Sequence, residues 1–343
     1  MKTYILTLLC LISFSICYAQ KAHDRQQFAN LGDFKLENGQ VIQDCRIGYR
    51  VYGKLNSAKN NGILFPSWFG GTAKDVEYTE PWKAIDTAKY CLIIADAFGD
   101  GVSSSPSNSQ KQHGPRFPHF SIRDMVESQY RLLVSKMGIV HLHAVMGISM
   151  GGIQTFQWAV SHPNFMDVLI PIVGSPRPSS YDLMGYNIYV RVIENDPAFQ
   201  HGYYKKNPII LPAAMLSEFS ATTPEHKVRT MSRDSFAVWM KKVETTPTRD
   251  WNDYLYQAKA VIGHDISRPF GGSMQEAAKH VKAKVLIISS KQDHLVNPIP
   301  AIEFSKLLPA KLLVLDSDRG HVAPDFSDPT MQTAIVVALE GEF

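Results

Sequence analysis

The sequence is poor in cysteine, nearly balanced in charge and, after its first twenty residues, without long apolar runs. It has four cysteines in 343 residues, and no cysteine or histidine spacing typical of a metal site. The net charge of +3 is small for this length and gives no reason to expect nucleic acid as a partner. Because no later segment reaches spanning length, stable membrane insertion is not expected. We predict a globular protein with no metal and no cofactor.

The N-terminal segment has the pattern of a secretory signal peptide. Lys2 supplies a positive charge, residues 4–16 are almost wholly apolar, and Ala19 is a small residue at a cleavage point before Gln20. We therefore predict a signal peptide at residues 1–19 and a secreted or periplasmic mature protein. A membrane anchor is the alternative, but the apolar run is short for a span and polar residues follow at once.

Two cysteines, Cys45 and Cys91, lie outside the predicted signal peptide, and export would permit a disulfide between them. Cys91 opens an apolar stretch, residues 91–95, that is typical of a buried strand, where a free thiol is more common. Since sequence spacing does not define the distance between the two sulfur atoms, both states stay open at this point.

Short apolar segments alternate with helical ones along most of the chain. A turn at residues 38–39 predicts a hairpin, and residues 45–52 predict a third strand. Further strands are expected at residues 62–65, 90–95, 141–146, 166–173, 283–290 and 311–316. Strands that alternate with helices indicate an α/β fold, with a mostly parallel central sheet flanked by helices on both faces.

The alternation stops between residues 176 and 280. This segment is mostly helical in pattern and has no strong strand. We interpret it as a helical cap inserted between a first core part, residues 20–175, and a second, residues 281–343. A separate helical domain with its own function is the alternative.

One five-residue motif indicates chemistry. Residues 147–151 match G-x-S-x-G between an apolar strand and a helical run, which is the pattern of a nucleophile elbow that raises Ser149 above a sheet. Glycines stand two positions to either side because the backbone comes too close there for a Cβ atom. The helix N-terminus would favour negative charge that develops at the serine. A βα turn without chemistry is the alternative.

An elbow serine needs a histidine base and a carboxylate that orients the base, in the chain order Ser, Asp, His. Asp293 and His321 follow two successive predicted strands, at the carboxyl ends where α/β sheets place their sites. After Asp293 the only histidines are His294 and His321, and His294 is poorly placed to bridge the acid to the serine. Asp316 and Asp318 are rival acids, which we expect to cap the loop.

A glycine pair in residues 66–72 follows the strand at 62–65 and frees the backbone to point N–H groups at a ligand. We predict an oxyanion hole made by the N–H of Met150 and one from the Trp68–Phe69 region. A plain glycine-rich turn is the alternative. The serine would attack an acyl carbonyl, and water or another nucleophile would release the acyl-enzyme.

Several longer segments of the chain match the sequence pattern of one protein family. They lie around the elbow, in the segment before it and in the cap. They cover residues 103–108, 114–118, 121–124, 147–154, 193–197 and 202–204. In these segments the chain resembles the homoserine O-acetyltransferase family of α/β-hydrolases, and the resemblance extends from about Gly48 to the C-terminus. It implies an α/β-hydrolase fold, the roles of nucleophile, acid and base for Ser149, Asp293 and His321, and a possible homodimer through the cap.

The chain also departs from that family. Family transferases usually carry an arginine six residues before the aspartate that is Asp196 here, and this position is Val190. Arg191 is shifted by one residue, about 100° around a helix. Acetyl-CoA and homoserine are cytoplasmic metabolites, whereas an exported enzyme has water as its abundant acceptor. We expect a serine ester hydrolase acting on a small-molecule acyl ester. An O-acyltransferase of the homoserine O-acetyltransferase type is the alternative, and a non-enzymatic binding protein is the third reading.

Overall fold

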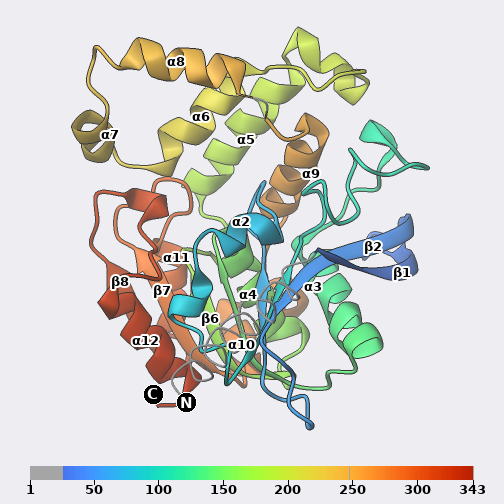
Figure 1. Ribbon diagram of the computed structural model, residues 1–343, viewed down its shortest axis with the longest axis vertical. Helices are drawn as coiled ribbons and strands as arrows, with labels where there is room; N and C mark the ends of the chain where they lie inside the picture. The colour runs from blue at the N-terminus through green and yellow to red at the C-terminus, as the bar shows by residue number, and fades with distance from the viewer. Residues whose placement is uncertain (1–25, 247, 343) are drawn as a thin grey trace, which may run out of the picture.

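The computed structural model describes residues 26–246 and 248–342, so the predicted signal peptide lies outside the described residues. An eight-stranded sheet runs through the molecule in the order β1-β2-β4-β3-β5-β6-β7-β8 (Figure 1). Its strands are β1 (Gln27–Lys35), β2 (Val41–Tyr52), β3 (Gly62–Pro66), β4 (Cys91–Ala95), β5 (Leu142–Ile148), β6 (Met166–Ile172), β7 (Lys284–Ser290) and β8 (Ala310–Leu315). From β4 to β8 neighbouring strands are parallel, and only the pairs β1–β2 and β2–β4 are antiparallel, which confirms the predicted mostly parallel sheet.

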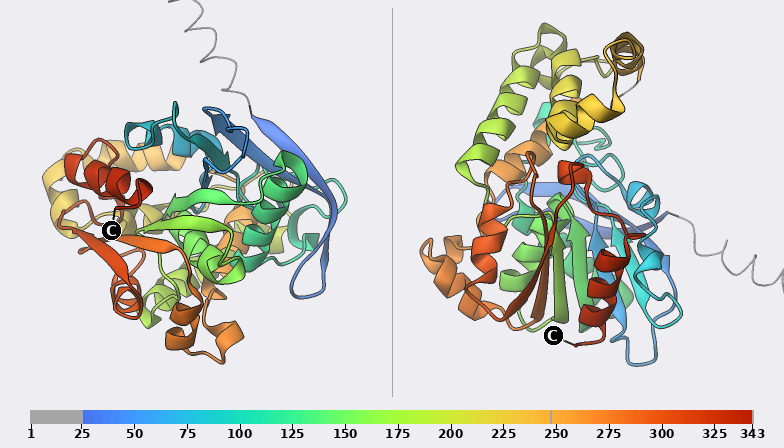
Figure 2. Two further views of the ribbon diagram at one scale, coloured as in Figure 1. Left: turned by 90° about the horizontal axis from the view of Figure 1, so that it is seen from below. Right: turned by 90° about the vertical axis from the view of Figure 1, so that its left-hand side faces the viewer.

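The central strands are apolar throughout because helices cover both faces of the sheet. On β3, Leu64 packs into one core, whereas Ile63 and Phe65 point into the other. One face carries α3 (Ile122–Arg131), α4 (Met150–Ser161), α10 (Met274–His280) and α11 (Ile299–Ser305), and the other carries α2 (Ala73–Glu77) and α12 (Pro329–Leu339). Figure 2 shows the sheet between these two layers.

The predicted third strand at residues 45–52 is wrong as a separate element, because it is the second half of β2. The register of β1 against β2 shifts between Gly32 and Phe34, whose partners are Cys45 and Ile42. Asp44 lies at this bulge with a φ of 50°. A bulge interrupts the period-two alternation of side chains. The sequence pattern of one bent strand therefore predicts two separate strands.

Among the described residues of the predicted cap segment, five α-helices lie between β6 and α10. They are α5 (Ser180–Glu194), α6 (Leu211–Ala221), α7 (Pro224–Thr230), α8 (Phe236–Thr245) and α9 (Trp251–Ile262). Helices α5 to α8 stand above the carboxyl ends of the parallel strands (Figure 1). In contrast, α10 packs against α4 beside the sheet, so the helical layer above the strands ends before residue 280.

Cys45 on β2 and Cys91 on β4 are both free thiols buried in the core. Burial raises the pKa of Cys45 to about 12 and that of Cys91 to about 11. None of the helices within the described ranges combines the length and apolarity needed to cross a membrane.

Candidate active site

Ser149 stands at a sharp turn between β5 and α4. Its φ of 59° and ψ of −122° lie in a region that residues with a side chain rarely adopt. The Ser149 N–H donates to the carbonyl of Ile172 at 2.9 Å, and its carbonyl accepts from the N–H of Ile153 at 2.9 Å. These bonds hold the strained residue between the sheet and the first turn of α4, with its hydroxyl at the carboxyl end of β5.

The two motif glycines are required by close backbone approach, as the sequence predicts. A Cβ atom on Gly147 would lie 2.6 Å from the Gly151 carbonyl carbon. One on Gly151 would lie 2.4 Å from the carbonyl oxygen of Pro66, at the end of β3. Cβ atoms in folded proteins essentially never come this close to another heavy atom that is not bonded to them. Neither position therefore accepts a side chain without moving the backbone.

The structure brings the three predicted side chains into one hydrogen-bonded series. His321 Nε2 lies 2.8 Å from Ser149 Oγ, and His321 Nδ1 lies 2.7 Å from Asp293 Oδ2. Asp293 follows β7, and His321 lies in a short 3₁₀ turn, Gly320–Val322, after β8. All three residues are buried. A nucleophile, a base and an orienting acid within hydrogen-bond reach form the arrangement that acyl transfer needs.

Backbone groups orient the Asp293 carboxylate. Its Oδ1 accepts from the N–H groups of Leu295 and Val296, both at 2.8 Å, which leaves Oδ2 to face His321. The two rival acids lie elsewhere, since Asp316 pairs with Lys291 at 2.8 Å and Asp318 contacts the cap. Local hydrogen bonding therefore fixes which oxygen of the acid meets the histidine.

The loop after β3 faces the same space as Ser149. Trp68 and Phe69 line the cavity at Ser149, and within the described part of the chain their backbone N–H groups find no acceptor. Met150 is the first residue of α4, where backbone N–H groups have no partner within the helix. The predicted oxyanion residues thus lie around the serine with donors available to a ligand.

Two buried glutamines that the sequence did not indicate hold this loop. Gln154 Nε2 on α4 donates to the Ser67 carbonyl at 3.0 Å. Gln257 on α9 accepts from the Gly70 N–H at 2.7 Å and donates to the Phe98 carbonyl at 2.9 Å. A polar residue inside an apolar helix was the only available signal for Gln154, and no local pattern marks Gln257.

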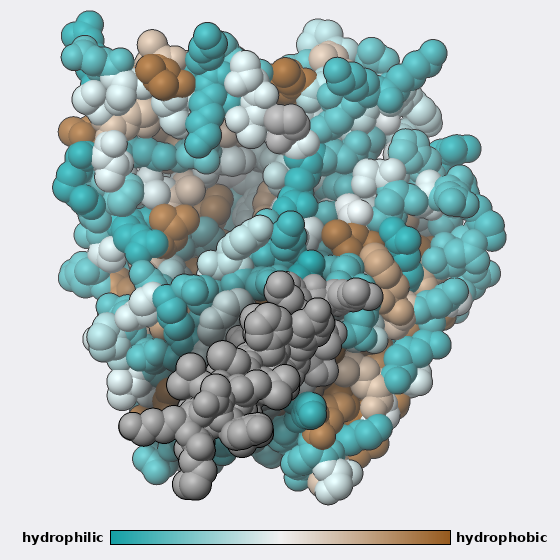
Figure 3. Space-filling view, viewed as in Figure 1, coloured by the Kyte–Doolittle hydropathy of each residue, from teal (hydrophilic) through white to brown (hydrophobic). Residues whose placement is uncertain are grey.

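A cavity of about 1130 Å³ opens above Ser149 and His321 and extends under the cap. Its walls come mostly from α5, α6, α7 and α8, together with the loop after β3. The face in Figure 3 is recessed between the cap and the sheet, with hydrophobic side chains exposed near the recess. Most of the cavity surface is apolar, and Ser149 and His321 lie among polar side chains that include Asp182, Lys227 and Arg319.

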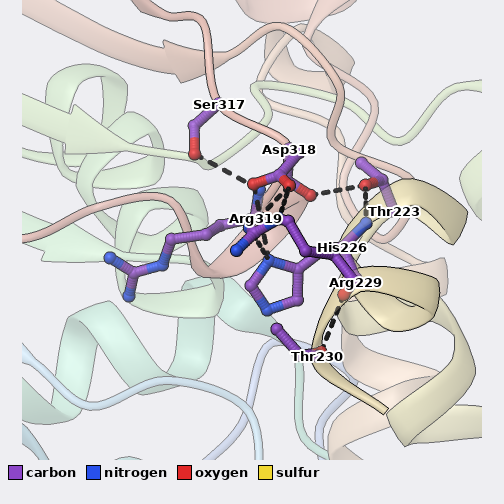
Figure 4. A network of polar contacts seen from close by, with 7 residues as sticks. All are labelled: Thr223, His226, Arg229, Thr230, Ser317, Asp318 and Arg319. Carbon is purple, nitrogen blue, oxygen red and sulfur yellow. Dashed lines mark hydrogen bonds and ion pairs between the residues drawn. The ribbon is translucent and has the colours of Figure 1, made fainter. Parts of the chain in front are cut away.

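A polar network joins the cap to the loop that carries His321 (Figure 4). Asp318 accepts from Arg229 Nε at 3.0 Å and from Nη2 at 2.6 Å, and His226 Nδ1 lies 3.4 Å from its other oxygen. The Asp318 carbonyl accepts from Thr223 Oγ1 at 2.5 Å. The Arg229 guanidinium holds the pKa of Asp318 below its usual value. The network ties α7, one wall of the cavity, to the histidine loop.

The chain is similar to known esterases and acyltransferases over most of its length. The chain is 32% identical over 329 residues to an ethyl acetate hydrolase of Pseudomonas veronii, covering 92% of this chain and 94% of the relative. It is 32% identical over 341 residues to a homoserine O-acetyltransferase of Methanococcoides burtonii, covering 85% and 68%. The solved structure of an acetylester hydrolase from Corynebacterium glutamicum is similar with a TM-score of 0.83 and 27% identity, over 93% of this chain and 97% of the other.

The family assignment follows from the sequence match together with the fold. Residues 63–328 match the alpha/beta hydrolase fold family, which is more than half of the chain. The chain therefore belongs to the α/β-hydrolase family of enzymes, with homoserine O-acetyltransferases among its relatives.

Proposed function

We propose that this protein is an exported serine ester hydrolase that works through an acyl-enzyme on Ser149. The observation that carries the proposal is the series of two short hydrogen bonds from Asp293 through His321 to Ser149 at the cavity. Relatives named ethyl acetate hydrolase and acetylester hydrolase support it and suggest acetyl as the acyl group.

In the first half of the reaction Ser149 Oγ attacks the carbonyl carbon of the ester. His321 Nε2 takes the hydroxyl proton and then gives it to the leaving alkoxide, which departs as an alcohol. Asp293 Oδ2 accepts a hydrogen bond from the Nδ1–H group of His321 and so stabilises the imidazolium that forms in between. The carbonyl oxygen, negatively charged in the tetrahedral intermediate, would accept from the N–H of Met150 and from one in the Trp68–Phe69 region.

In the second half, water attacks the acetyl carbon of the acyl-enzyme and His321 takes one of its protons. Collapse of the tetrahedral intermediate breaks the bond to Ser149 Oγ, which recovers its proton from His321. The products are one acid and one alcohol, and the enzyme returns to its starting state.

An O-acyltransferase is the second candidate, because homoserine O-acetyltransferases are among the relatives. The side chain at the family's arginine position argues against it. Val190 is buried in the apolar core, and Arg191 is exposed on α5 and is absent from the cavity wall. A homoserine carboxylate would therefore lack the cation that family transferases usually carry at this position.

The first test is hydrolysis of p-nitrophenyl acetate by the chain starting at Gln20, compared with Ser149→Ala. We expect steady release of nitrophenol by the wild type and loss of at least a thousandfold in the variant, as for removal of other triad serines. The same assay with acetyl-CoA and homoserine separates the candidates. Acetyl-CoA consumption that needs homoserine, with negligible ester turnover, would replace the hydrolase by the transferase.

Export is a separate part of the proposal and rests on the apolar segment at residues 4–16. We expect the full chain, expressed with a bacterial secretion system, to leave the cytoplasm with a mature N-terminus at Gln20. Mass spectrometry of the recovered protein measures this. An uncleaved chain in the cytoplasm would contradict export without touching the chemistry.

A further inference from the structure

The cavity above Ser149 is larger than an acetyl group and a small alcohol require. At about 1130 Å³ it exceeds the roughly 300–1,000 Å³ of pockets that hold drug-sized ligands. Since the proposed acyl group is acetyl, most of this space falls to the alcohol part of the ester. The lining of that space then decides which alcohols bind.

Four aromatic side chains form one wall, which we call the aromatic wall: Phe69, Tyr186, Tyr189 and Tyr254. The Phe69 ring lies 6.0 Å from Tyr186, 5.9 Å from Tyr189 and 5.5 Å from Tyr254, measured between centroids. Tyr186 and Tyr189 come from α5 and Tyr254 from α9, so three separate segments fix the rings against one another. Packed rings form a rigid apolar surface beside the proposed oxyanion loop.

The cations on the cavity wall already have carboxylate partners. Lys227 Nζ lies 3.3 Å from Glu218, and Arg319 Nη1 lies 3.5 Å from Asp325. The Asp182 carboxylate accepts from the backbone N–H groups of Ser179 and Asn297. A substrate carboxylate would have to break one of these pairs or stay unpaired in an apolar space, which is costly.

We propose that the site selects neutral acetate esters of bulky apolar alcohols, whose alkyl or aryl part packs against the aromatic wall. The inference rests on the proposed function, because it places the acyl group on Ser149. Phe69 would then serve both parts of the substrate, its backbone near the carbonyl oxygen and its ring beside the alcohol.

The primary test is kcat/KM for ethyl, butyl, hexyl and 2-phenylethyl acetate, followed by release of acetate. Burial of one methylene is worth about fourfold, so we expect a rise on the order of 100-fold from ethyl to hexyl acetate. A flat or falling series with the wild type active would overturn the inference while leaving the ester hydrolase intact. No turnover of any acetate would instead overturn the proposed function.

Two matched pairs of substrates test the remaining parts of the proposal. Ethyl phenylacetate is an isomer of 2-phenylethyl acetate with the ring on the acyl side, and we expect it to be the poorer substrate. Methyl 4-acetoxybenzoate should be cleaved at least tenfold faster than 4-acetoxybenzoate, which carries a carboxylate. If ethyl phenylacetate were the better substrate, the bulky group would lie on the acyl part of the ester and not on the alcohol part. Equal rates in the second pair would overturn the selection for neutral esters.

Substitution of one residue of the aromatic wall tests whether the wall causes the preference for bulky alcohols. Tyr189→Ala should lower the ratio of kcat/KM for 2-phenylethyl acetate over ethyl acetate by about tenfold, whereas Tyr189→Phe should keep the ratio. Tyr203, exposed and outside the cavity, supplies the matched control Tyr203→Ala. Because the readout is a ratio, partial unfolding cannot imitate it, and an unchanged ratio in Tyr189→Ala would exclude the aromatic wall.

Discussion

At the scale of single residues, hydrogen bonds decide which atom meets which. Ser149 keeps a backbone conformation that costs on the order of 1–3 kcal/mol because its N–H and carbonyl are both engaged, with Ile172 and Ile153. Hydrogen bonds likewise orient the side chain of Asp293. Its two oxygens are inequivalent, since one accepts two backbone N–H groups and the other faces His321.

That inequivalence predicts the effect of Asp293→Asn. The amide oxygen would keep the bonds from Leu295 and Val296, which turns the NH₂ group toward His321 Nδ1. The proton of the imidazole would then sit on Nε2, where it blocks acceptance of the Ser149 proton. We expect kcat to fall by about 10⁴, measured with p-nitrophenyl acetate. Circular dichroism checks that the fold is kept, and a loss below tenfold would contradict the role of Asp293.

Asp253 offers a test of stability against pH. It is buried at the start of α9, where it accepts from the N–H and the hydroxyl of Ser107, at 2.9 and 2.5 Å. Burial raises its pKa to about 7. Between about pH 4 and 7 the Asp253 carboxyl loses its proton in the unfolded chain and keeps it in the folded chain. Its contribution to the free energy of unfolding is therefore complete below pH 4 and is lost as pH rises through 7.

The isosteric variant Asp253→Asn resembles the protonated carboxyl, so it should remove that pH dependence. Relative to the wild type, the variant should gain stability from pH 4 to 8, by on the order of 4 kcal/mol at most. Urea unfolding at several pH values measures the difference, in which all other titrating groups cancel. Parallel curves for the two proteins would contradict a raised pKa at Asp253.

At the scale of elements, two helices control the loop between β3 and α2. Gln154 on α4 holds the Ser67 carbonyl and Gln257 on α9 holds the Gly70 N–H, so the donors of Trp68 and Phe69 lie between two fixed points. Behind Gln154, the Gln129 side chain donates to it at 2.6 Å and accepts from Trp158 at 2.9 Å. This chain of buried amides connects α3 and α4 to the loop.

Gln257→Leu removes one of these fixed points and leaves the Gly70 N–H and the Phe98 carbonyl without partners. Because a lost oxyanion donor costs about 10²–10³ in kcat, a displaced loop should cost about 10 to 100-fold in kcat with little change in KM. Gln157→Leu on α4 is the matched control, since Gln157 is equally buried but bonds Ser161 rather than the loop. If the two substitutions had equal effects on kcat, Gln257 would contribute to the stability of the fold and not to the position of the loop.

At the scale of the whole molecule, the cap carries more exposed apolar surface than a solvated helical layer needs. Met184, Phe219, Val228 and Val238 are each more than half exposed, and they come from four different cap helices. Exposed apolar groups gathered on one part of a protein are typical of a ligand groove or a protein interface. Met184, Phe219 and Val228 line the cavity, whereas Val238 does not, so Val238 is the one of the four that a homodimer through the cap would cover.

Val238→Glu on α8 tests this, because Val238 is exposed and does not line the cavity. We expect the wild type to sediment as a dimer and the variant as a monomer, since a carboxylate cannot be buried unpaired at an interface. Val140 is equally exposed and lies before β5, at the opposite end of the sheet, so Val140→Glu should stay dimeric. A monomeric wild type would refute the predicted dimer.

The sequence by itself determined the sheet, the elbow and the order of the three site residues. These depend on local spacing: apolar runs between turns, glycines two positions from a serine, and polar residues directly after strands. Residues 45–52 show where this stops, because the bulge at Asp44 breaks the period and one strand reads as two. Local patterns define elements but not the irregularities that shape them.

Only the tertiary structure decided what surrounds the site. The bond between Gly70 and Gln257 joins residues 187 positions apart, and no local pattern at either end indicates the other. The aromatic wall likewise joins Phe69 to residues of α5 and α9, and Asp318 meets Arg229 across the cap. Such pairings depend on how complete elements pack, and packing is set by the whole core rather than by any one segment.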